Sequence, residues 1–152
     1  MNVYEKSLEV MESLFARDCL FSLATSAGDA PTVRVVDAYY QEGAFYVVAY
    51  TSTQKARDIA VNPNVAMCDM FKRFSGKAEI IGHPLDEKNR EIREKLIKVF
   101  EGWYFLHNNE SDAEMCYIKI TPEKGFFHKD KVGYRVDFAG KSAESIPFSP
   151  ED

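Results

Sequence analysis

Residues 32–50 read TVRVVDAYYQEGAFYVVAY, which is two strand-forming runs separated by a turn. The first run, 32–40, is rich in β-branched and aromatic residues, and residues 41–43 interrupt it before the second run, 44–50. The second run is apolar at both sets of alternating positions. We therefore expect it to be a central strand, covered on one side by a barrel interior and on the other by a helix or a second subunit.

The segment before these strands predicts a helix and one further strand. Residues 2–17 carry apolar side chains at the spacing of one helical face: Tyr4, Leu8, Met11 and Phe15. The apolar run 19–25 predicts a strand, and the small, polar, Pro- and Gly-containing residues 26–31 predict a turn. Residues 19–50 are thus expected to form three strands in meander order.

The rest of the chain continues the β-rich pattern. Residues 53–61 predict a short helix that ends at Asn62-Pro63-Asn64, because proline disfavours helical geometry at the preceding residue. The remaining expected elements are strands near 64–71 and 73–82, a helix from Pro84 to about 100, an irregular stretch over 102–112, strands near 114–120 and 125–138, and a loosely ordered tail over 146–152. Many strands with few helices and short turns favour a closed or partly closed antiparallel barrel, mainly β with peripheral helices.

The bulk composition indicates one ordinary domain, residues 1–152. A chain of 152 residues with 45% hydrophobic residues can bury a core without a metal or a disulfide. A net charge of -5 provides no broad positive field, so we expect no nucleic-acid partner. Three cysteines in apolar runs predict buried free thiols in a reducing compartment. With no signal-peptide pattern and no apolar run of roughly 20 residues, we expect a cytoplasmic protein without a membrane partner.

The segment from Tyr50 to Arg57, YTSTQKAR, combines a strand end, three hydroxyls, a helix start and two cations. Thr53 is a candidate N-cap, and the first helical turn after it offers free backbone N–H groups and a positive dipole end. Lys55 and Arg57 fall in that turn, where a cation costs a few tenths to about 1 kcal/mol unless an anion lies beside it. Either a bound phosphate removes this conflict, or both side chains extend into solvent.

Arg34 is a second candidate ligand for an anion. It lies among strand valines, and strand alternation places Thr32, Arg34 and Val36 on one face. A guanidinium in such a position needs a partner, because an unpaired buried charge costs several kcal/mol. The partner is either a nearby acid, such as Asp37, Asp69 or Glu79, or a phosphate gripped in bidentate fashion.

The order of these features, from residue 5 to about 138, resembles the pyridoxamine 5'-phosphate oxidase-related, FMN-binding split β-barrel family. The landmarks are Pro31-x-x-Arg34-Val35-Val36, Phe45-Tyr46 through Tyr50-Thr51, Thr53-Gln54-Lys55-Ala56, Asn62-Pro63-Asn64-Val65 and Ser75-Gly76-Lys77-Ala78-Glu79. No single landmark is specific, but five in this order and spacing make coincidence improbable.

The resemblance implies an antiparallel, Greek-key-like barrel and a homodimer with FMN in clefts at the subunit interface. The strand bearing Arg34 would back the isoalloxazine ring. Carried over residue by residue, the phosphate contacts would be Arg34, Thr51, Thr53 and Lys55, and the contacts to the ring or the ribityl chain would be Val35, Val36 and Tyr50. Ser52 and Gln54 are additional candidates for the cofactor site.

The sequence departs from the vitamin B6 oxidases of that family at three places. Gln54 stands where those oxidases carry an Arg beside the lysine, and Phe71 or Lys72 stands where they carry a Gln. The tail 146–152 also lacks their Arg-containing C-terminal motif. The resemblance is therefore closer to the shorter relatives, which include nitroimidazole reductases, flavin reductases and heme-handling proteins, and oxidation of pyridoxamine phosphate is not expected.

Other chemistry-bearing residues form no recognisable motif. His83, His107 and His128 share no metal-ligand spacing, so we expect no metal site, although His107 and His128 are the candidates if the barrel handles heme. Cys68 and Cys116 are predicted core thiols. The aromatic segment Trp103-Tyr104-Phe105 is either a lid over a flavin or packing at a dimer interface.

The resulting hypothesis is a flavin-dependent oxidoreductase that uses FMN to reduce a small molecule with electrons from a nicotinamide donor. No side chain is assigned as a general acid or base, because the flavin carries the chemistry and the protein supplies position, exclusion of water and charge. The alternative is a heme- or flavin-binding carrier on the same barrel. A deazaflavin is the alternative cofactor for the enzyme.

Overall fold

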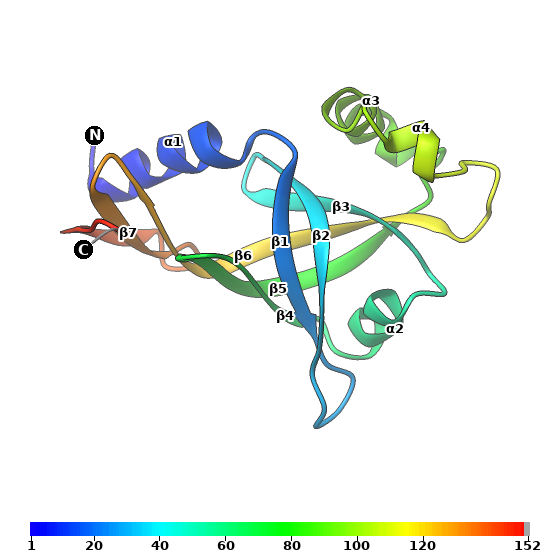
Figure 1. Cartoon of the computed structure of the whole chain (residues 1–152), viewed down its shortest axis with the longest axis horizontal. Helices are drawn as coiled ribbons and strands as arrows, with labels where there is room; N and C mark the ends of the chain where they lie inside the picture. Colours follow the sequence, from blue (N-terminus) through cyan, green and yellow to red (C-terminus); the bar gives the residue numbers. More distant parts are fainter. Residues whose placement is uncertain (151–152) are drawn as a thin grey trace.

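The computed structural model describes residues 1–150. Its elements, in chain order, are α1 (Val3–Phe15), β1 (Cys19–Thr25), β2 (Thr32–Gln41), β3 (Ala44–Tyr50), α2 (Gln54–Val61), β4 (Asn64–Asp69), β5 (Lys72–Gly82), the 3-10 turn η1 (Glu87–Asn89), α3 (Arg90–Val99), α4 (Tyr104–His107), β6 (Met115–Lys129), β7 (Val132–Asp137) and β8 (Ser142–Pro147). The expected mainly β architecture with peripheral helices is confirmed (Figure 1).

Six antiparallel strands close into a barrel. The sheet order is β3-β2-β1-β4-β5-β6-β7-β8, and an additional pairing of β3 with β6 closes the ring. The order β3-β2-β1-β4 is that of a Greek key, because β4 returns to lie beside β1. Glu42 and Gly43, with φ values of 47° and 87°, form the two-residue hairpin between β2 and β3. Strands β7 and β8 extend the sheet beyond the barrel (Figure 1).

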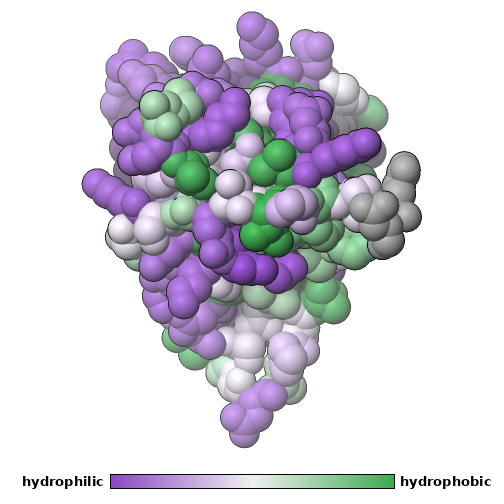
Figure 2. Space-filling view, turned by 90° about the vertical axis from the view of Figure 1, so that its left-hand side faces the viewer, coloured by the Kyte–Doolittle hydropathy of each residue, from purple (hydrophilic) through white to green (hydrophobic). Residues whose placement is uncertain are grey.

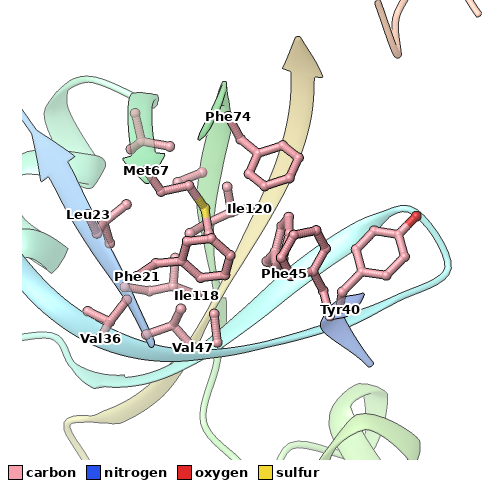
Figure 3. Close-up of a cluster of buried hydrophobic side chains, with 14 of the residues drawn as sticks. Phe21, Leu23, Val36, Tyr40, Phe45, Val47, Met67, Phe74, Ile118 and Ile120 are labelled. Carbon is pink, nitrogen blue, oxygen red and sulfur yellow. The ribbon is translucent and has the colours of Figure 1, made fainter. Parts of the chain in front are cut away.

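The barrel interior is filled by large side chains, many of them aromatic. On β3, the inward residues Phe45, Val47 and Ala49 are at most 2% exposed. Phe15, at the end of α1, packs among them with its ring centroid 5.7 Å from that of Phe45. Figure 3 shows side chains from β1 to β6 converging on this core. Such interdigitated packing supplies most of the favourable free energy of folding.

The outer face of β3 is covered as well. Tyr46, Val48 and Tyr50 pack against a second cluster, which includes Leu96 of α3 and Tyr104 of α4. The expectation that this strand is covered on both faces is confirmed, and helices of the same chain supply the outer cover (Figure 1). The apolar residues on both faces of this run are therefore required by its central position.

The two strands predicted near 114–120 and 125–138 are divided at a different place in the structure: β6, Met115–Lys129, is one strand of fifteen residues, and residues 130–131 separate it from β7. The register between β5 and β6 shifts between Ser75 and Gly76, and Pro122 lies opposite Gly76 at this irregularity. A β-bulge tolerates a proline that an unbroken ladder would exclude. A Cβ on Gly76 would lie 2.8 Å from the Pro122 Cα and closer still to the Thr121 carbonyl oxygen, so the close approach requires glycine.

The predicted loose tail is also partly wrong. Ile146 and Pro147 end strand β8, which pairs with β7, and the Phe148 ring lies 5.1 Å from the ring of Phe126. Residues 151–152 of that predicted tail lie outside the described residues. Figure 2, which faces the end of the molecule bearing α1 and β7, shows hydrophobic groups within a largely hydrophilic surface. None of the helices within residues 1–150 is long and apolar enough to cross a membrane.

Candidate anion site at the start of helix α2

Helix α2 begins directly after β3 and packs against β1 and β5. The predicted N-cap is confirmed: the Thr53 hydroxyl accepts from the Ala56 backbone N–H at 3.4 Å and donates to the Tyr50 carbonyl at 2.8 Å. Thr51 and Ser52, which precede the cap, are exposed. The helix start therefore presents backbone N–H groups and two accessible hydroxyls at one end of the barrel.

Lys55 is a half-buried cation without a counter-ion. Among residues 1–150, no carboxylate forms an ion pair with the Lys55 ammonium group, and the ammonium group donates no hydrogen bond. Burial lowers the pKa of Lys55, and the positive charge of Arg34 lowers it further. The buried thiol of Cys116 also lies close to it. A lysine held beside an arginine in the first turn of a helix is an arrangement that an anion would stabilise.

Arg34 has partners, but none of the acids named from sequence is among them. Its guanidinium donates to the Leu23 carbonyl at 3.2 Å, the Thr25 hydroxyl at 2.7 Å and the Thr32 hydroxyl at 2.5 Å. The nearest acid in this network is Asp58, which accepts from both threonine hydroxyls. The Nε–H of Arg34 makes no hydrogen bond within the described part of the chain, so donors remain for a ligand.

Asp58 is the functional candidate that sequence reasoning missed. Its side chain is 2% exposed and also accepts from Gln54 Nε2 at 2.5 Å. Hydrogen bonds from Thr25, Gln54 and Thr32, together with the charge of Arg34, hold the pKa of this carboxyl below its usual range. The pairing of Thr25 with Thr32 in the β1–β2 register brings both threonines next to Asp58 on α2, and no local sequence pattern signals this contact.

Arg57 does not belong with Arg34 and Lys55 as an unpartnered cation. Its guanidinium folds back on its own turn, where it donates to the Ser52 carbonyl and, at 3.0 Å, to Gln54 Oε1. Gln54 is thus engaged on both sides, by Arg57 and by Asp58. Of the two helix-start cations identified from the sequence, Lys55 alone remains without a hydrogen-bond or ion-pair partner among residues 1–150.

The residues expected near the flavin ring do not face one space. Val35 is 64% exposed on the outer face of β2, whereas Val36 is 7% exposed and lies in the barrel core. The Tyr50 hydroxyl donates to Asn108 Oδ1 at 3.2 Å and accepts from the Asn109 N–H at 3.1 Å. Strand alternation separates Val35 from Val36, so only one of these two side chains is accessible.

The aromatic segment after α3 packs within its own chain. The Trp103 ring stacks on Phe100 with centroids 4.5 Å apart, and its indole N–H donates to Asp18 at 2.9 Å. Phe105 and Leu106 are 58% and 77% exposed. The anchored indole is part of the scaffold, and the exposed pair next to it is the portion available to a ligand or partner.

The remaining histidines and cysteines form no cluster. Within residues 1–150, no three His, Cys, Asp or Glu side chains are grouped so that they could hold a metal ion. His107 ends α4 and is exposed, and the His128 ring lies 4.9 Å from the ring of Phe148. Cys116 is buried as expected, but the prediction for Cys68 is wrong: it is exposed, because alternation along β4 turns it outward.

Comparison with known proteins supports the fold at the family level. Residues 8–129 match the family model described as pyridoxamine 5'-phosphate oxidase. A NimC/NimA family protein from Clostridium acetobutylicum is 21% identical, with 97% of this chain and 95% of that chain covered and a TM-score of 0.59. A pyridoxamine 5'-phosphate oxidase-related, FMN binding protein from Nostoc punctiforme is 13% identical, with 99% and 98% covered and a TM-score of 0.57.

A structure described as an F420 reductase is also similar, with 24% identity, 73% of this chain and 91% of that chain covered, and a TM-score of 0.55. None of the curated proteins matches the chain. At these identities the solved structures establish the barrel, whereas the family model spans most of the sequence. The chain therefore belongs to the pyridoxamine 5'-phosphate oxidase-related family of FMN-binding split barrels.

Proposed function

We propose that this chain binds FMN with the phosphate at Arg34, Lys55 and the first turn of α2. The observation that carries the proposal is the half-buried Lys55 ammonium, which lies beside a second cation and lacks a counter-ion among residues 1–150. A phosphate would accept from this ammonium, from the unused Nε–H of Arg34 and from helix N–H groups. The exposed hydroxyls of Thr51 and Ser52 would add donors at the same helix start.

We further propose that the bound flavin makes the protein an oxidoreductase for a small molecule, with electrons from a nicotinamide donor. FMN would supply the hydride and electron transfer, and the chain would supply the phosphate grip and the ring contacts. Val35 would contact the ring with its exposed side chain. Val36 would contribute only its backbone, because its side chain lies in the core.

A homodimer completes the proposal, because β1 and β2 expose an apolar outer face. Leu20, Val33 and Val35 are 60%, 68% and 64% exposed on these paired strands. Val33 also lines a cleft of about 850 Å³ that continues from this face toward β7 and β8. Exposed apolar surface of this kind marks an interaction site. A second copy seated on this face would cover it and lie over the strand that carries Arg34.

The phosphate site is tested by comparing FMN with riboflavin, which lacks the phosphate. Wild-type protein should bind FMN more tightly, and Arg34→Ala and Lys55→Ala should each weaken FMN binding by about 1.5–3 kcal/mol, the cost of a charged hydrogen bond. Arg57→Ala is the matched control, because its partners lie in its own turn, and it should leave the affinity nearly unchanged. Unchanged FMN affinity in both Arg34→Ala and Lys55→Ala would refute the site.

The visible spectrum tests the proposed oxidoreductase, and the oligomeric state tests the proposed homodimer. Two flavin bands in the purified protein, bleached by NADH or NADPH, support the oxidoreductase. An intense Soret band after heme addition, with no bound flavin, would contradict it.

Val33→Glu should give a monomer in analytical ultracentrifugation, whereas Val61→Glu, at an equally exposed valine on α2, should not. Equal behaviour of the two variants would place the interface elsewhere.

A further inference from the structure

Asp58 is connected to Arg34 through two threonine hydroxyls. Asp58 Oδ2 accepts from Thr25 Oγ1 at 2.7 Å and from Thr32 Oγ1 at 3.0 Å. The same two hydroxyls accept from Arg34, from Nη1 at 2.7 Å and from Nη2 at 2.5 Å. Asp58 and Arg34 are therefore bridged by both threonine hydroxyls, although no direct ion pair joins the two residues.

The direction of every hydrogen bond in this relay is fixed by chemistry. An ionised carboxylate can only accept and a guanidinium can only donate, whereas a hydroxyl has one proton and two lone pairs. Each threonine must therefore donate to Asp58 and accept from Arg34. Both ends are charge-assisted, which makes these hydrogen bonds stronger than neutral ones. The hydroxyls act as rigid spacers between two opposite charges.

The relay orients the guanidinium rather than neutralising it. Thr25 and Thr32 engage both Nη atoms of Arg34, and the Leu23 carbonyl takes a further N–H. The guanidinium plane is thereby held, while the Nε–H has no partner within residues 1–150. Asp58 reaches Arg34 only through hydroxyls, so it stabilises the cation without occupying the edge that would grip an anion.

The relay also connects the elements that build the site. Thr25 ends β1, Thr32 begins β2 and Asp58 lies on α2, one turn after Gln54. Gln54 Nε2 donates to the second carboxylate oxygen at 2.5 Å, so both oxygens are fixed. The buried Asp58 carboxylate thus fixes the position of β2, which carries Arg34, relative to α2, which carries Lys55.

We propose that Asp58 is a positioning residue for anion binding: through Thr25 and Thr32 it orients Arg34 toward the phosphate of the flavin. This inference rests on the proposed function, because the phosphate is its ligand. It predicts a role in phosphate recognition that goes beyond holding α2 on the barrel. A purely structural Asp58 would affect ligands with and without a phosphate equally.

The test uses full-length Asp58→Asn, which keeps the size and an acceptor oxygen but removes the charge. Affinities for FMN and riboflavin are measured by flavin fluorescence titration at fixed pH and ionic strength. We expect FMN binding to weaken about tenfold, with riboflavin binding changed less than twofold. Asp29→Asn, an exposed acid in the β1–β2 loop, removes the same charge without a relay and should behave as wild type.

A double variant and an isosteric threonine variant make the test decisive. In an Arg34→Ala background, Asp58→Asn should cause no further loss of FMN affinity, because the group it orients is gone. Thr32→Val should reproduce the FMN-selective loss, and it serves as the deciding variant if Asp58→Asn does not fold.

Equal losses for both flavins, or unchanged FMN affinity, would overturn the positioning role, as would a full Asp58→Asn effect in the Arg34→Ala background. Failure of the proposed function gives a different result. In that case wild-type protein would not prefer FMN over riboflavin, and Arg34→Ala and Lys55→Ala would change neither affinity. That result would remove the phosphate site and the role of Asp58 together.

Discussion

Replacing Lys55 with methionine should stabilise the protein without ligand while weakening its grip on FMN. The Lys55 ammonium is half-buried beside Arg34 and has no counter-ion among residues 1–150. A cation in the first helical turn is unfavourable by 0.3 to about 1 kcal/mol, and burial next to a second cation adds to this cost. Methionine keeps the aliphatic stem that packs against the barrel and removes the charge.

We therefore expect Lys55→Met to raise the free energy of unfolding by about 1 kcal/mol, which corresponds to an increase in Tm of roughly 2–4 °C for a domain of this size. The assay is urea and thermal unfolding of flavin-free protein at one protein concentration. Arg57→Met, which removes an exposed cation that has hydrogen-bond partners, should not increase stability. A Lys55→Met variant less stable than wild type would refute the reasoning, because Lys55 would then be paired in the folded protein.

Three further changes test the electrostatics and the packing of the barrel. Burial, a hydrogen bond that protonated Asp37 donates to Asp18 and the negative charge of Asp18 raise the pKa of Asp37 from 3.8 to about 7. Between pH 3.8 and about 7 the folded protein therefore binds more protons than the unfolded chain, and the free energy of unfolding falls as pH rises through this range. Asp37→Asn should remove this dependence, about 1 kcal/mol after allowance for solvent screening, in urea unfolding at pH 5 and pH 8; identical pH profiles would contradict it. Gly76→Ala should cost about 3 kcal/mol, because the added Cβ meets the Thr121 carbonyl, and a loss below 0.5 kcal/mol in urea unfolding would show that β6 can shift. Phe45→Ala should cost about 3–5 kcal/mol by the same assay, since this ring is fully buried among other rings, and a small loss would mean that the core collapses around the cavity.

The fold was predictable where local pattern and tertiary position agree. The run 44–50 is apolar at every position because β3 has the barrel core on one face and α3 and α4 on the other. The interruption predicted between strands 114–120 and 125–138 is absent, because Gly76 on the neighbouring strand β5 accommodates Pro122 within β6. The strand β8 was missed because its residues, SAESIP, have little β-propensity and are held by pairing with β7.

The candidate site was predictable in its two cations and in the Thr53 N-cap of α2. Lys55 was identified because a cation at a helix start conflicts with the dipole, and Arg34 because a charge conflicts with a valine-rich strand. The sequence gives no indication that Arg57 folds back on its own turn, or that Asp58 reaches Arg34 through two hydroxyls. The contacts of Asp58 depend on tertiary placement, and those of Arg57 depend on one local side-chain conformation; no residue pattern in the sequence signals either of them.

The two cations of the proposed site have different tasks because their surroundings differ. Arg34 is held by hydroxyls and a carbonyl that leave part of its planar fork free, so it can supply direction. Lys55 has no hydrogen bond among residues 1–150 and a lowered pKa, so it supplies charge that the folded protein has not yet compensated. Asp58 stabilises and orients the half-buried guanidinium of Arg34 through two hydroxyls, and it forms no ion pair with Lys55. Binding of a phosphate would then relieve an existing electrostatic cost at Lys55 and use an orientation already established at Arg34, a preorganised arrangement that needs little rearrangement on binding.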